Sequence, residues 1–180
     1  MQKRNGVPLL PEARNFNVYK TRFCDVTIVS DGDAIVGLWL RDVEIPGARR
    51  ETSDLTDRVA GQLEEYFDGR RLDFDVAIRP SGTEFQMDVW KALLEIPYGE
   101  TRSYSDIAES IGRPRACRAV GMANNRNPIS IIIPCHRVIG ADGSLVGYGG
   151  GLDMKQKLLD LENGRYDLWS QGTLPPECGA

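Results

Sequence analysis

The chain has 180 residues, of which 41% are hydrophobic and 27% are charged, and its formal net charge is −4. These values are typical of a globular protein of one or two small domains, and they exclude a generally basic nucleic-acid-binding surface. No apolar stretch is long enough to span a membrane, so we expect a soluble, cytoplasmic protein without a membrane contact.

The cysteines and the histidine limit the metal chemistry that the chain can support. Four cysteines are widely spaced, without a Cys-x-x-Cys pair, and His136 is the only histidine. A zinc site of the usual type takes closely spaced pairs of Cys or His ligands, which this chain lacks, so we expect no metal and no cofactor. Free thiols in a reducing compartment are the expectation for Cys24, Cys117, Cys135 and Cys178.

The first part of the chain predicts a small sheet with one helix. β-prone residues form three runs, at 17–23, 26–29 and 34–40. Between the last two runs, Asp31-Gly32-Asp33 is typical of a hairpin turn. Residues 54–67 place apolar side chains four apart and predict a helix, and 72–78 are a candidate for one more strand. This part contains no catalytic combination of residues, so we expect it to support the rest of the chain.

A linker and a new helix mark the predicted domain boundary. Residues 79–82 contain proline and glycine, and Thr83 with Gln86 forms a capping-box pattern that predicts a helix through Ile96. We predict an α/β fold, with a small N-terminal sheet-plus-helix domain (1–80) followed by a mostly helical C-terminal domain (81–166) that contains a helix-turn-helix. The remaining residues, 167–180, are expected to form a flexible tail.

Two short helices are predicted after this first C-terminal helix. Ser103 is a suitable N-cap for one of them, which Gly112 can end. Pro114 occupies a favoured first-turn position for the other. Two such helices joined by a turn of about two to four residues are similar to a helix-turn-helix.

Arginines concentrate in the same region. Residues 101–139 contain two acidic residues and six arginines, which gives a local charge of +4: Arg102, Arg113, Arg115, Arg118, Arg126 and Arg137. Arginine is suited to binding phosphates and base edges, so these residues form a candidate binding patch. A solvated charged face is the alternative.

The residues most suggestive of catalysis follow an apolar run. Residues 129–133 predict a buried strand, and Pro134 ends it directly before Cys135 and His136. Glu162 lies beside the apolar stripe of a final predicted helix, 152–162, where a carboxylate needs a partner. Together these residues suggest a nucleophile, a base and an orienting group.

Geometry suggests that a water carries the proton between Cys135 and His136, because adjacent residues of an extended segment point in opposite directions. Two alternatives stay open. The cysteine can be a small core residue, and Glu162 can pair with Arg165 at a frayed helix end. The glycine-rich residues 147–151 lack the spacing of a phosphate-binding loop, but they allow backbone to approach a flat ligand closely.

The segment Pro134-Cys135-His136-Arg137-Val138 resembles the active-site signature of the O6-alkylguanine-DNA alkyltransferases, also called methylated-DNA–protein-cysteine methyltransferases. The resemblance runs from about Phe85 to Glu162 in one register. It includes Trp90-Lys91, Pro97-Tyr98-Gly99-Glu100, Ser103-Tyr104, Arg118-Ala119-Val120-Gly121, Asn127-Pro128 and Gly150-Gly151-Leu152.

The resemblance implies a role for each matching residue in the reaction. Cys135 would take the alkyl group from guanine O6, His136 would accept the thiol proton through a water, and Glu162 would hold the imidazole. Asn127 would brace the active-site segment, and Tyr104 would donate a proton toward guanine N3. The thioether cannot be released by these groups, so the resemblance implies a single turnover.

The resemblance also implies how the substrate is held. The partner would be double-stranded DNA containing O6-alkylguanine, bound by a monomer through the minor groove, with the damaged base flipped out. Arg118 would fill the place of the flipped base. Further DNA contacts would come from Arg113, Arg115, Ala119, Arg126 and Arg137, and the base pocket from Val138, Tyr148, Gly149 and Gly150.

Two departures and two alternatives accompany this resemblance. Some members have serine where Gly149 stands, and some carry zinc in an N-terminal domain for which this chain lacks the histidines. One alternative is a helix-turn-helix protein that binds lesions without catalysis. The other is a thiol hydrolase that uses Cys135, His136 and Glu162 over many turnovers.

Overall fold

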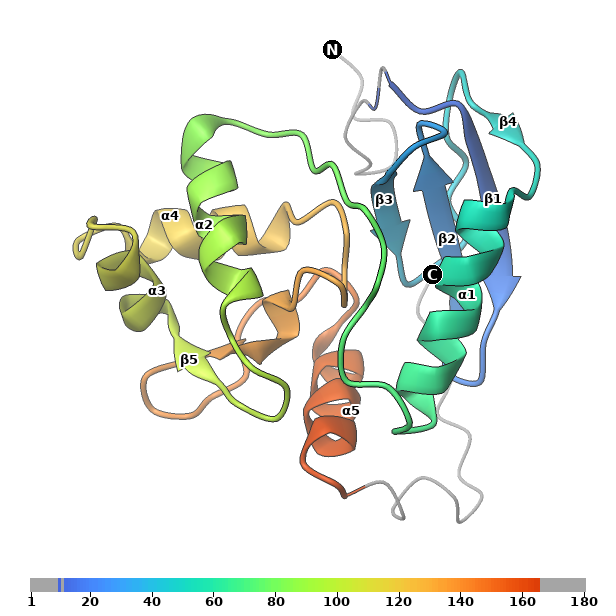
Figure 1. Ribbon diagram of the computed structural model, residues 1–180. Helices are drawn as coiled ribbons and strands as arrows, with labels where there is room; N and C mark the ends of the chain where they lie inside the picture. The colour runs from blue at the N-terminus through green and yellow to red at the C-terminus, as the bar shows by residue number, and fades with distance from the viewer. Residues whose placement is uncertain (1–9, 11, 166–180) are drawn as a thin grey trace.

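The computed structural model describes residue 10 and residues 12–165, and its first part is a four-stranded sheet covered by one helix (Figure 1). The strand order is β3-β2-β1-β4, with antiparallel pairs except for the parallel pair of β1 and β4. The strands are β1 (Asn15–Lys20), β2 (Asp25–Ser30), β3 (Ile35–Trp39) and β4 (Arg49–Arg50). The predicted turn at 31–33 joins β2 to β3, which confirms the hairpin.

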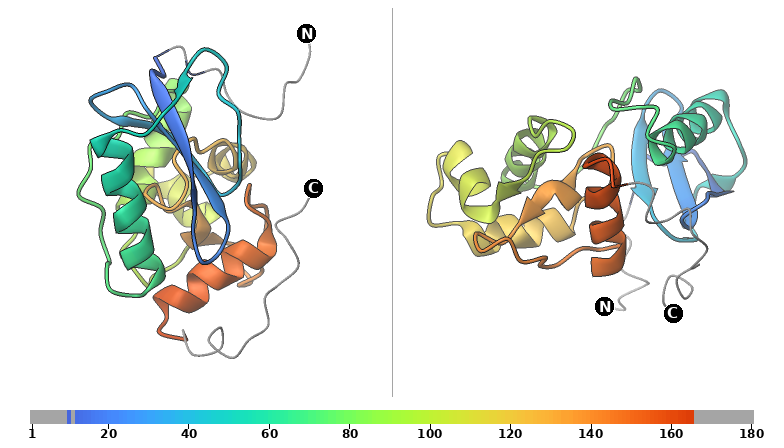
Figure 2. Two further views of the ribbon diagram at one scale, coloured as in Figure 1. Left: turned by 90° about the vertical axis from the view of Figure 1, so that its right-hand side faces the viewer. Right: turned by 90° about the horizontal axis from the view of Figure 1, so that it is seen from below.

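Helix α1 (Asp54–Phe67) has the predicted bounds and lies against one face of this sheet (Figure 2). Ser53 caps its N-terminus in a reciprocal capping box with Thr56, which satisfies two backbone donors that a helix start leaves open. One stripe of α1 is buried and includes Leu63 and Tyr66. The other face of the sheet carries a separate apolar cluster of Phe16, Val29, Val36, Trp39, Val43 and Ile45.

The strand predicted at 72–78 does not form. In this segment only Ile78 bridges Ile35 at the free edge of β3, through hydrogen bonds from Ile35 N to Ala77 O and from Arg79 N to Ile35 O. The segment approaches the sheet only at its end, so its earlier residues have no partner strand. Arg79 then pairs with the buried Asp31 and fixes the start of the linker.

The C-terminal part is mostly helical, as predicted, and with the N-terminal sheet it gives the predicted α/β class. Its elements are α2 (Glu84–Leu94), β5 (Arg102–Ser103), α3 (Tyr104–Ser110), α4 (Cys117–Asn125), the 3₁₀ helix η1 (Cys135–Arg137), β6 (Val138–Ile139) and α5 (Leu152–Glu162). The predicted capping box of Thr83 and Gln86 starts α2, and Ser103 caps α3. Strands β5 and β6 pair in parallel.

The helix α4 begins three residues later than predicted. Pro114 and Arg115 lie in a turn between Arg113 and Ala116, which is closed by a hydrogen bond from Ala116 N to Arg113 O. Helix α4 therefore starts at Cys117 without a side-chain cap. Two short packed helices are present as predicted, but the segment between them is longer than the predicted turn.

The apolar run before Cys135 is not the predicted strand. It meets β3 at a single bridge between Ile129 and Leu38 and then bends, because Ile131 has a φ of 69°. A positive φ is uncommon for a β-branched residue and shows that packing overrides local preference here. Alternate side chains of the run are nevertheless buried, so it still fills the core on the way to Cys135.

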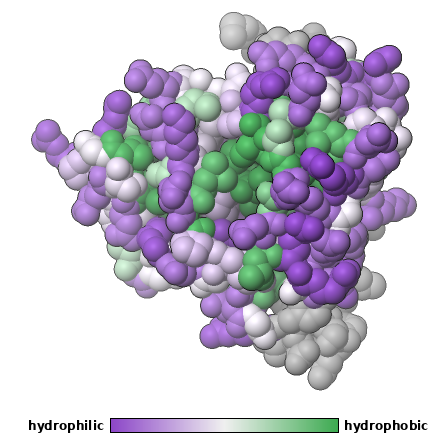
Figure 3. Space-filling model, viewed as in Figure 1, coloured by the Kyte–Doolittle hydropathy of each residue, from purple (hydrophilic) through white to green (hydrophobic). Residues whose placement is uncertain are grey.

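The two parts of the chain share one hydrophobic core. Its buried residues come from the sheet and α1, including Leu38 and Leu63, and from α2, α4 and α5, including Trp90 and Leu158. On the face seen in Figure 3, apolar side chains form a band across the middle of the molecule, between polar regions on either side. The division at residue 80 stays a prediction.

Among the described residues, no helix combines the length and the apolar character that crossing a bilayer requires.

Candidate active site

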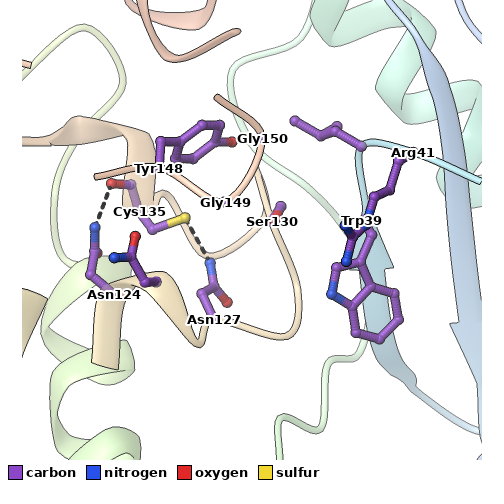
Figure 4. Close-up of a pocket in the computed structure, with 11 residues that line it drawn as sticks. Trp39, Arg41, Asn124, Asn127, Ser130, Cys135, Tyr148, Gly149 and Gly150 are labelled. Carbon is purple, nitrogen blue, oxygen red and sulfur yellow. Dashed lines mark hydrogen bonds between the residues drawn. The ribbon is translucent and has the colours of Figure 1, made fainter. Parts of the chain in front are cut away.

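Cys135 lies at a small cavity between the C-terminal part and strand β3 (Figure 4). The cavity has a volume of about 140 Å³. The residue is 3% exposed, and Asn127 Nδ2 donates to its Sγ at 3.1 Å and to the carbonyl of Ile133 at 2.8 Å. Asn124 holds the Cys135 carbonyl at 3.1 Å. The structure thus fixes Cys135 through both its thiol and its backbone carbonyl.

Burial raises the pKa of the Cys135 thiol to about 11, although the hydrogen bond from Asn127 and the charge of Lys155 act in the opposite direction. At neutral pH the resting thiol therefore keeps its proton. A reaction through its sulfur requires a base that removes the proton during the reaction.

His136 is the adjacent residue and is fully buried. Its Nε2 lies 2.9 Å from Oε1 of Glu162, whereas its Nδ1 has no hydrogen-bond partner among the described residues. Burial lowers the pKa of His136, against the charge and hydrogen bond of Glu162, so the ring is neutral at neutral pH. With a proton on Nε2 facing the carboxylate, Nδ1 is an acceptor.

Glu162, at the end of α5, is held by a buried ionic network. Arg137 donates to both carboxylate oxygens, through Nε to Oε2 at 2.9 Å and through Nη2 to Oε1 at 2.8 Å. The backbone N–H of Gly99 adds a contact at 3.3 Å. Burial raises the pKa of Glu162, but hydrogen bonds from His136 and Arg137 outweigh it and lower the pKa to about 2. The alternative partner Arg165 instead lies 3.9 Å from Asp160.

The prediction that Arg137 contacts DNA is wrong. Its side chain is buried, and besides its hydrogen bonds to Glu162 it donates to the carbonyl of Ile96 at 2.6 Å. A guanidinium held in this way serves the active-site network and cannot reach a phosphate outside. Arg102 pairs with Glu100 at 2.8 Å, so the predicted arginine field is smaller than the sequence indicated.

Four arginines of the predicted field are exposed: Arg113 and Arg115 in the turn before α4, Arg118 on α4 and Arg126 at its C-terminus. Arg113 lies over the ring of Phe85, with 5.5 Å from its Cζ to the ring centroid. Ala119 is half-buried on the same helix. Sequence reasoning did not single out Met122, an apolar residue of α4 that is 59% exposed.

The glycine-rich loop forms one wall of the cavity. Tyr148, Gly149 and Gly150, three of the four residues predicted for the base pocket, line it opposite the asparagines. A Cβ at Gly150 would lie 2.9 Å from the Tyr148 ring, so the close approach of backbone and ring depends on glycine. Val138 is fully buried and does not line the cavity.

Tyr104 lies outside the cavity wall, and its hydroxyl donates to the carbonyl of Val146 at 2.9 Å. Burial and then the charge of Cys135 raise the pKa of Tyr104 above its ordinary value, so its hydroxyl stays protonated at neutral pH.

Several residues of the site were missed by sequence reasoning. Lys155 is fully buried, and its Nζ donates to the carbonyls of Val138 at 2.6 Å and Val146 at 2.9 Å. A lysine within the apolar stripe of the last helix is a signal that could have found it. Trp39 and Arg41, at the end of β3, line the far side of the cavity and carry no sequence signal.

Chemically, the arrangement joins a protonated thiol, a neutral imidazole with an open nitrogen and a fixed carboxylate. Such a set can activate sulfur as a nucleophile toward a small electrophile in the cavity. Among residues 10 and 12–165, no group of three or more His, Cys, Asp or Glu side chains is placed to hold a metal ion.

Comparison with known proteins agrees with this site. A family model described as "6-O-methylguanine DNA methyltransferase, DNA binding domain" matches residues 84–164. The methylated-DNA–protein-cysteine methyltransferase of Methanosarcina barkeri is 62% identical over 120 residues, which cover 67% of this chain and 76% of that protein. The relative of the same name from Mycobacterium tuberculosis is 62% identical over 104 residues, which cover 58% of this chain and 63% of that one.

Solved structures agree as well. The crystal structure of Mycobacterium tuberculosis OGT in complex with DNA superposes with a TM-score of 0.79 at 45% identity, covering 84% of this chain and 94% of that one. An O6-methylguanine DNA methyltransferase from Methanococcus jannaschii superposes with a TM-score of 0.61 at 26% identity, covering 91% and 98%. Cavity, thiol, imidazole and carboxylate therefore occur in a chain that belongs to the methylated-DNA–protein-cysteine methyltransferase family.

Proposed function

We propose that this protein repairs DNA by transferring an alkyl group from O6 of guanine directly to its own Cys135. The observation that carries the proposal is the buried thiol of Cys135 at a cavity, held by Asn127. The next residue is His136, whose Nε2 is hydrogen-bonded to Glu162. The family to which the chain belongs supports the same reaction.

The proton path follows from the pKa values. Because the pKa of Cys135 is about 11, the thiol must lose its proton as it reacts. Nδ1 of neutral His136 accepts that proton through a bridging water, and Glu162 stabilises the imidazolium that forms. Arg137 keeps the carboxylate ionised and in place.

The transfer itself exchanges one bond for another. The sulfur attacks the alkyl carbon, the bond between that carbon and O6 breaks, and its electron pair goes to the guanine oxygen. Tyr104, which keeps its proton at neutral pH, supplies a proton toward N3 of the leaving base. The product is a thioether that these groups cannot cleave, so each molecule acts once.

The DNA contacts are the part of the proposal that rests most on electrostatics. A guanine must leave the stack to reach a cavity walled by protein, and Arg118, an exposed residue of α4, fills the space that it leaves. Exposed arginines around α4 bind the phosphates of the minor-groove edges, and the protein acts as a monomer. The M. tuberculosis structure in complex with DNA supports a DNA partner, and a DNA substrate agrees with the predicted cytoplasmic location.

Intact-mass measurement after incubation with an O6-methylguanine duplex tests the proposal. We expect one methyl group per molecule, located on Cys135 by peptide mapping and absent in Cys135→Ala. Cys117→Ala, which removes a cysteine from the surface of α4, is the matched control and should still be methylated. Binding without a mass change would favour a lesion-binding protein, and turnover of many ester molecules would favour a thiol hydrolase.

A further inference from the structure

Tyr66 brings the N-terminal part of the chain into the active-site network. It comes from α1 and is fully buried. Its hydroxyl donates to Oε1 of Glu162 at 2.6 Å and lies 3.4 Å from Nε2 of His136. These partners are 96 and 70 residues away in the sequence. A part of the chain that was expected only to support the fold therefore contacts both the base and its orienting carboxylate.

The ring of Tyr66 is packed so that its hydroxyl has one position. The rings of Phe67, Phe74 and Tyr98 lie within 6.0 Å of it, centroid to centroid. The charged and titratable groups that face it are Glu162 on α5, His136 and Arg137 on η1, and Tyr98 in the turn before β5. Burial, and then the charge of Glu162, raise the pKa of Tyr66 well above its ordinary value of 10.0, so the hydroxyl keeps its proton.

The direction of the hydrogen bonds follows from these facts. A hydroxyl has one proton to donate, and the ionised carboxylate of Glu162 can only accept. With the proton of Tyr66 on Glu162, the phenol oxygen presents a lone pair to Nε2 of His136. Both groups next to Nε2 are then acceptors, so a neutral imidazole carries its proton there and leaves Nδ1 without one.

We propose that Tyr66 is a positioning residue for alkyl transfer, which holds Glu162 and sets the tautomer of His136 so that Nδ1 can take the proton of Cys135. The inference rests on the proposed function for its kinetic part. Its structural part concerns only the state of His136, and the two parts can be measured separately.

Tyr66→Phe removes the hydroxyl and keeps the packed ring. Glu162 then loses one donor, and its less satisfied charge attracts a proton to His136 more strongly, which raises the pKa of the imidazole. Nδ1 is protonated in a larger fraction of molecules, so the acid limb of the rate profile should move to higher pH. At neutral pH we expect transfer to slow about tenfold, the factor that corresponds to one hydrogen bond to a charged group.

The single histidine makes the experiment direct, since every histidine signal in the spectrum belongs to His136. We would label histidine with ¹⁵N and record both ring nitrogens from pH 5 to 9 in the wild type and in Tyr66→Phe. Single-turnover transfer to Cys135 would be followed over the same range. The wild type should show a protonated Nε2 and a bare Nδ1, and the variant should show an imidazole pKa shifted upward.

Tyr19→Phe is the matched control. Its hydroxyl contacts the same helix, at 2.8 Å from Thr56 Oγ1 and 2.6 Å from Asp57 Oδ1, but it is not part of the network around Glu162. It should lower the melting temperature without changing the histidine spectrum or the pH profile. If Tyr66→Phe behaves in the same way, the inference is overturned. If the wild type transfers no alkyl group while Tyr66→Phe still shifts the His136 signals, the proposed function fails and the positioning of His136 is supported.

Discussion

Replacing Glu162 with glutamine tests how much the buried ionic network contributes to stability. The pKa of this carboxyl falls from an ordinary 4.5 to about 2 in the folded protein. Since one pKa unit corresponds to about 1.4 kcal/mol, the ionised carboxylate stabilises the fold by about 3 kcal/mol at neutral pH. Removing one partner of a buried ion pair costs about 3 to 5 kcal/mol. We therefore expect Glu162→Gln to lower the free energy of unfolding by about 3 to 5 kcal/mol at pH 7.

The loss of stability caused by this substitution should become smaller as the pH falls. Because the folded pKa of Glu162 lies below the unfolded one, its contribution is complete above pH 4.5 and is lost as the pH falls toward about 2. Glutamine does not titrate. The difference in stability between the wild type and the variant should therefore shrink between pH 4.5 and about 2.

Urea unfolding at pH 7, 4.5 and 3 measures this difference, with tryptophan fluorescence and circular dichroism as two probes of the same transition. For m-values of about 1 to 3 kcal/mol/M, a loss of about 3 to 5 kcal/mol should lower the midpoint at pH 7 by roughly 1 to 5 M. Glu65→Gln is the control, because Glu65 pairs with Arg71 at 2.6 Å but is 41% exposed. Exposed pairs contribute about 0 to 1 kcal/mol. A loss for Glu162→Gln no larger than this control, or one that does not change with pH, would refute the reasoning.

Three further predictions concern the reaction and the DNA. Asn127→Ala removes the donor 3.1 Å from Sγ, raises the pKa of Cys135 further and should slow single-turnover transfer about tenfold; an unchanged rate in a folded variant would contradict this. Arg118→Ala should slow transfer from duplex DNA far more than transfer from a free O6-substituted guanine base, and equal slowing would place Arg118 in the pocket. The affinity for an undamaged duplex, measured by fluorescence anisotropy, should fall with salt, and a plot of log affinity against log salt concentration should have a slope of about −3 to −4. The slope is about −0.9 per phosphate contacted, and four arginines around α4 are exposed. A flat salt dependence would remove the electrostatic argument for DNA binding.

Helices that are marked by apolar spacing or by a capping residue were predicted correctly from the sequence. Helices α1 and α5 have the predicted bounds, and the cap at Thr83 starts α2 where expected. The signal at Pro114 misplaced the start of α4, because proline suits the turn that precedes the helix as well as its first turn. The apolar run around Ile131 carries a strand pattern, but the chain bends there to meet both β3 and the active site.

The site was predicted as far as its residues are close together in the sequence or carry unusual chemistry. Cys135, His136 and Glu162 were found because a thiol, a lone histidine and a carboxylate on an apolar stripe need explanations. Tyr66 was not found, because a tyrosine in an apolar stripe fits a core position and nothing local shows which polar group its hydroxyl meets. Arg137 was assigned to DNA binding because of its charge, and nothing local in the sequence shows that it is buried and paired with Glu162.

The network around Glu162 also orders events during synthesis of the chain. Its members emerge in the sequence Tyr66, His136, Arg137 and finally Glu162, which is the last residue that the proton path needs. A nascent chain that has exposed Cys135 but not yet α5 therefore has a thiol without an oriented base. For a protein whose nucleophile can be used once, this order means that the base is oriented only when the fold that recognises the substrate is complete.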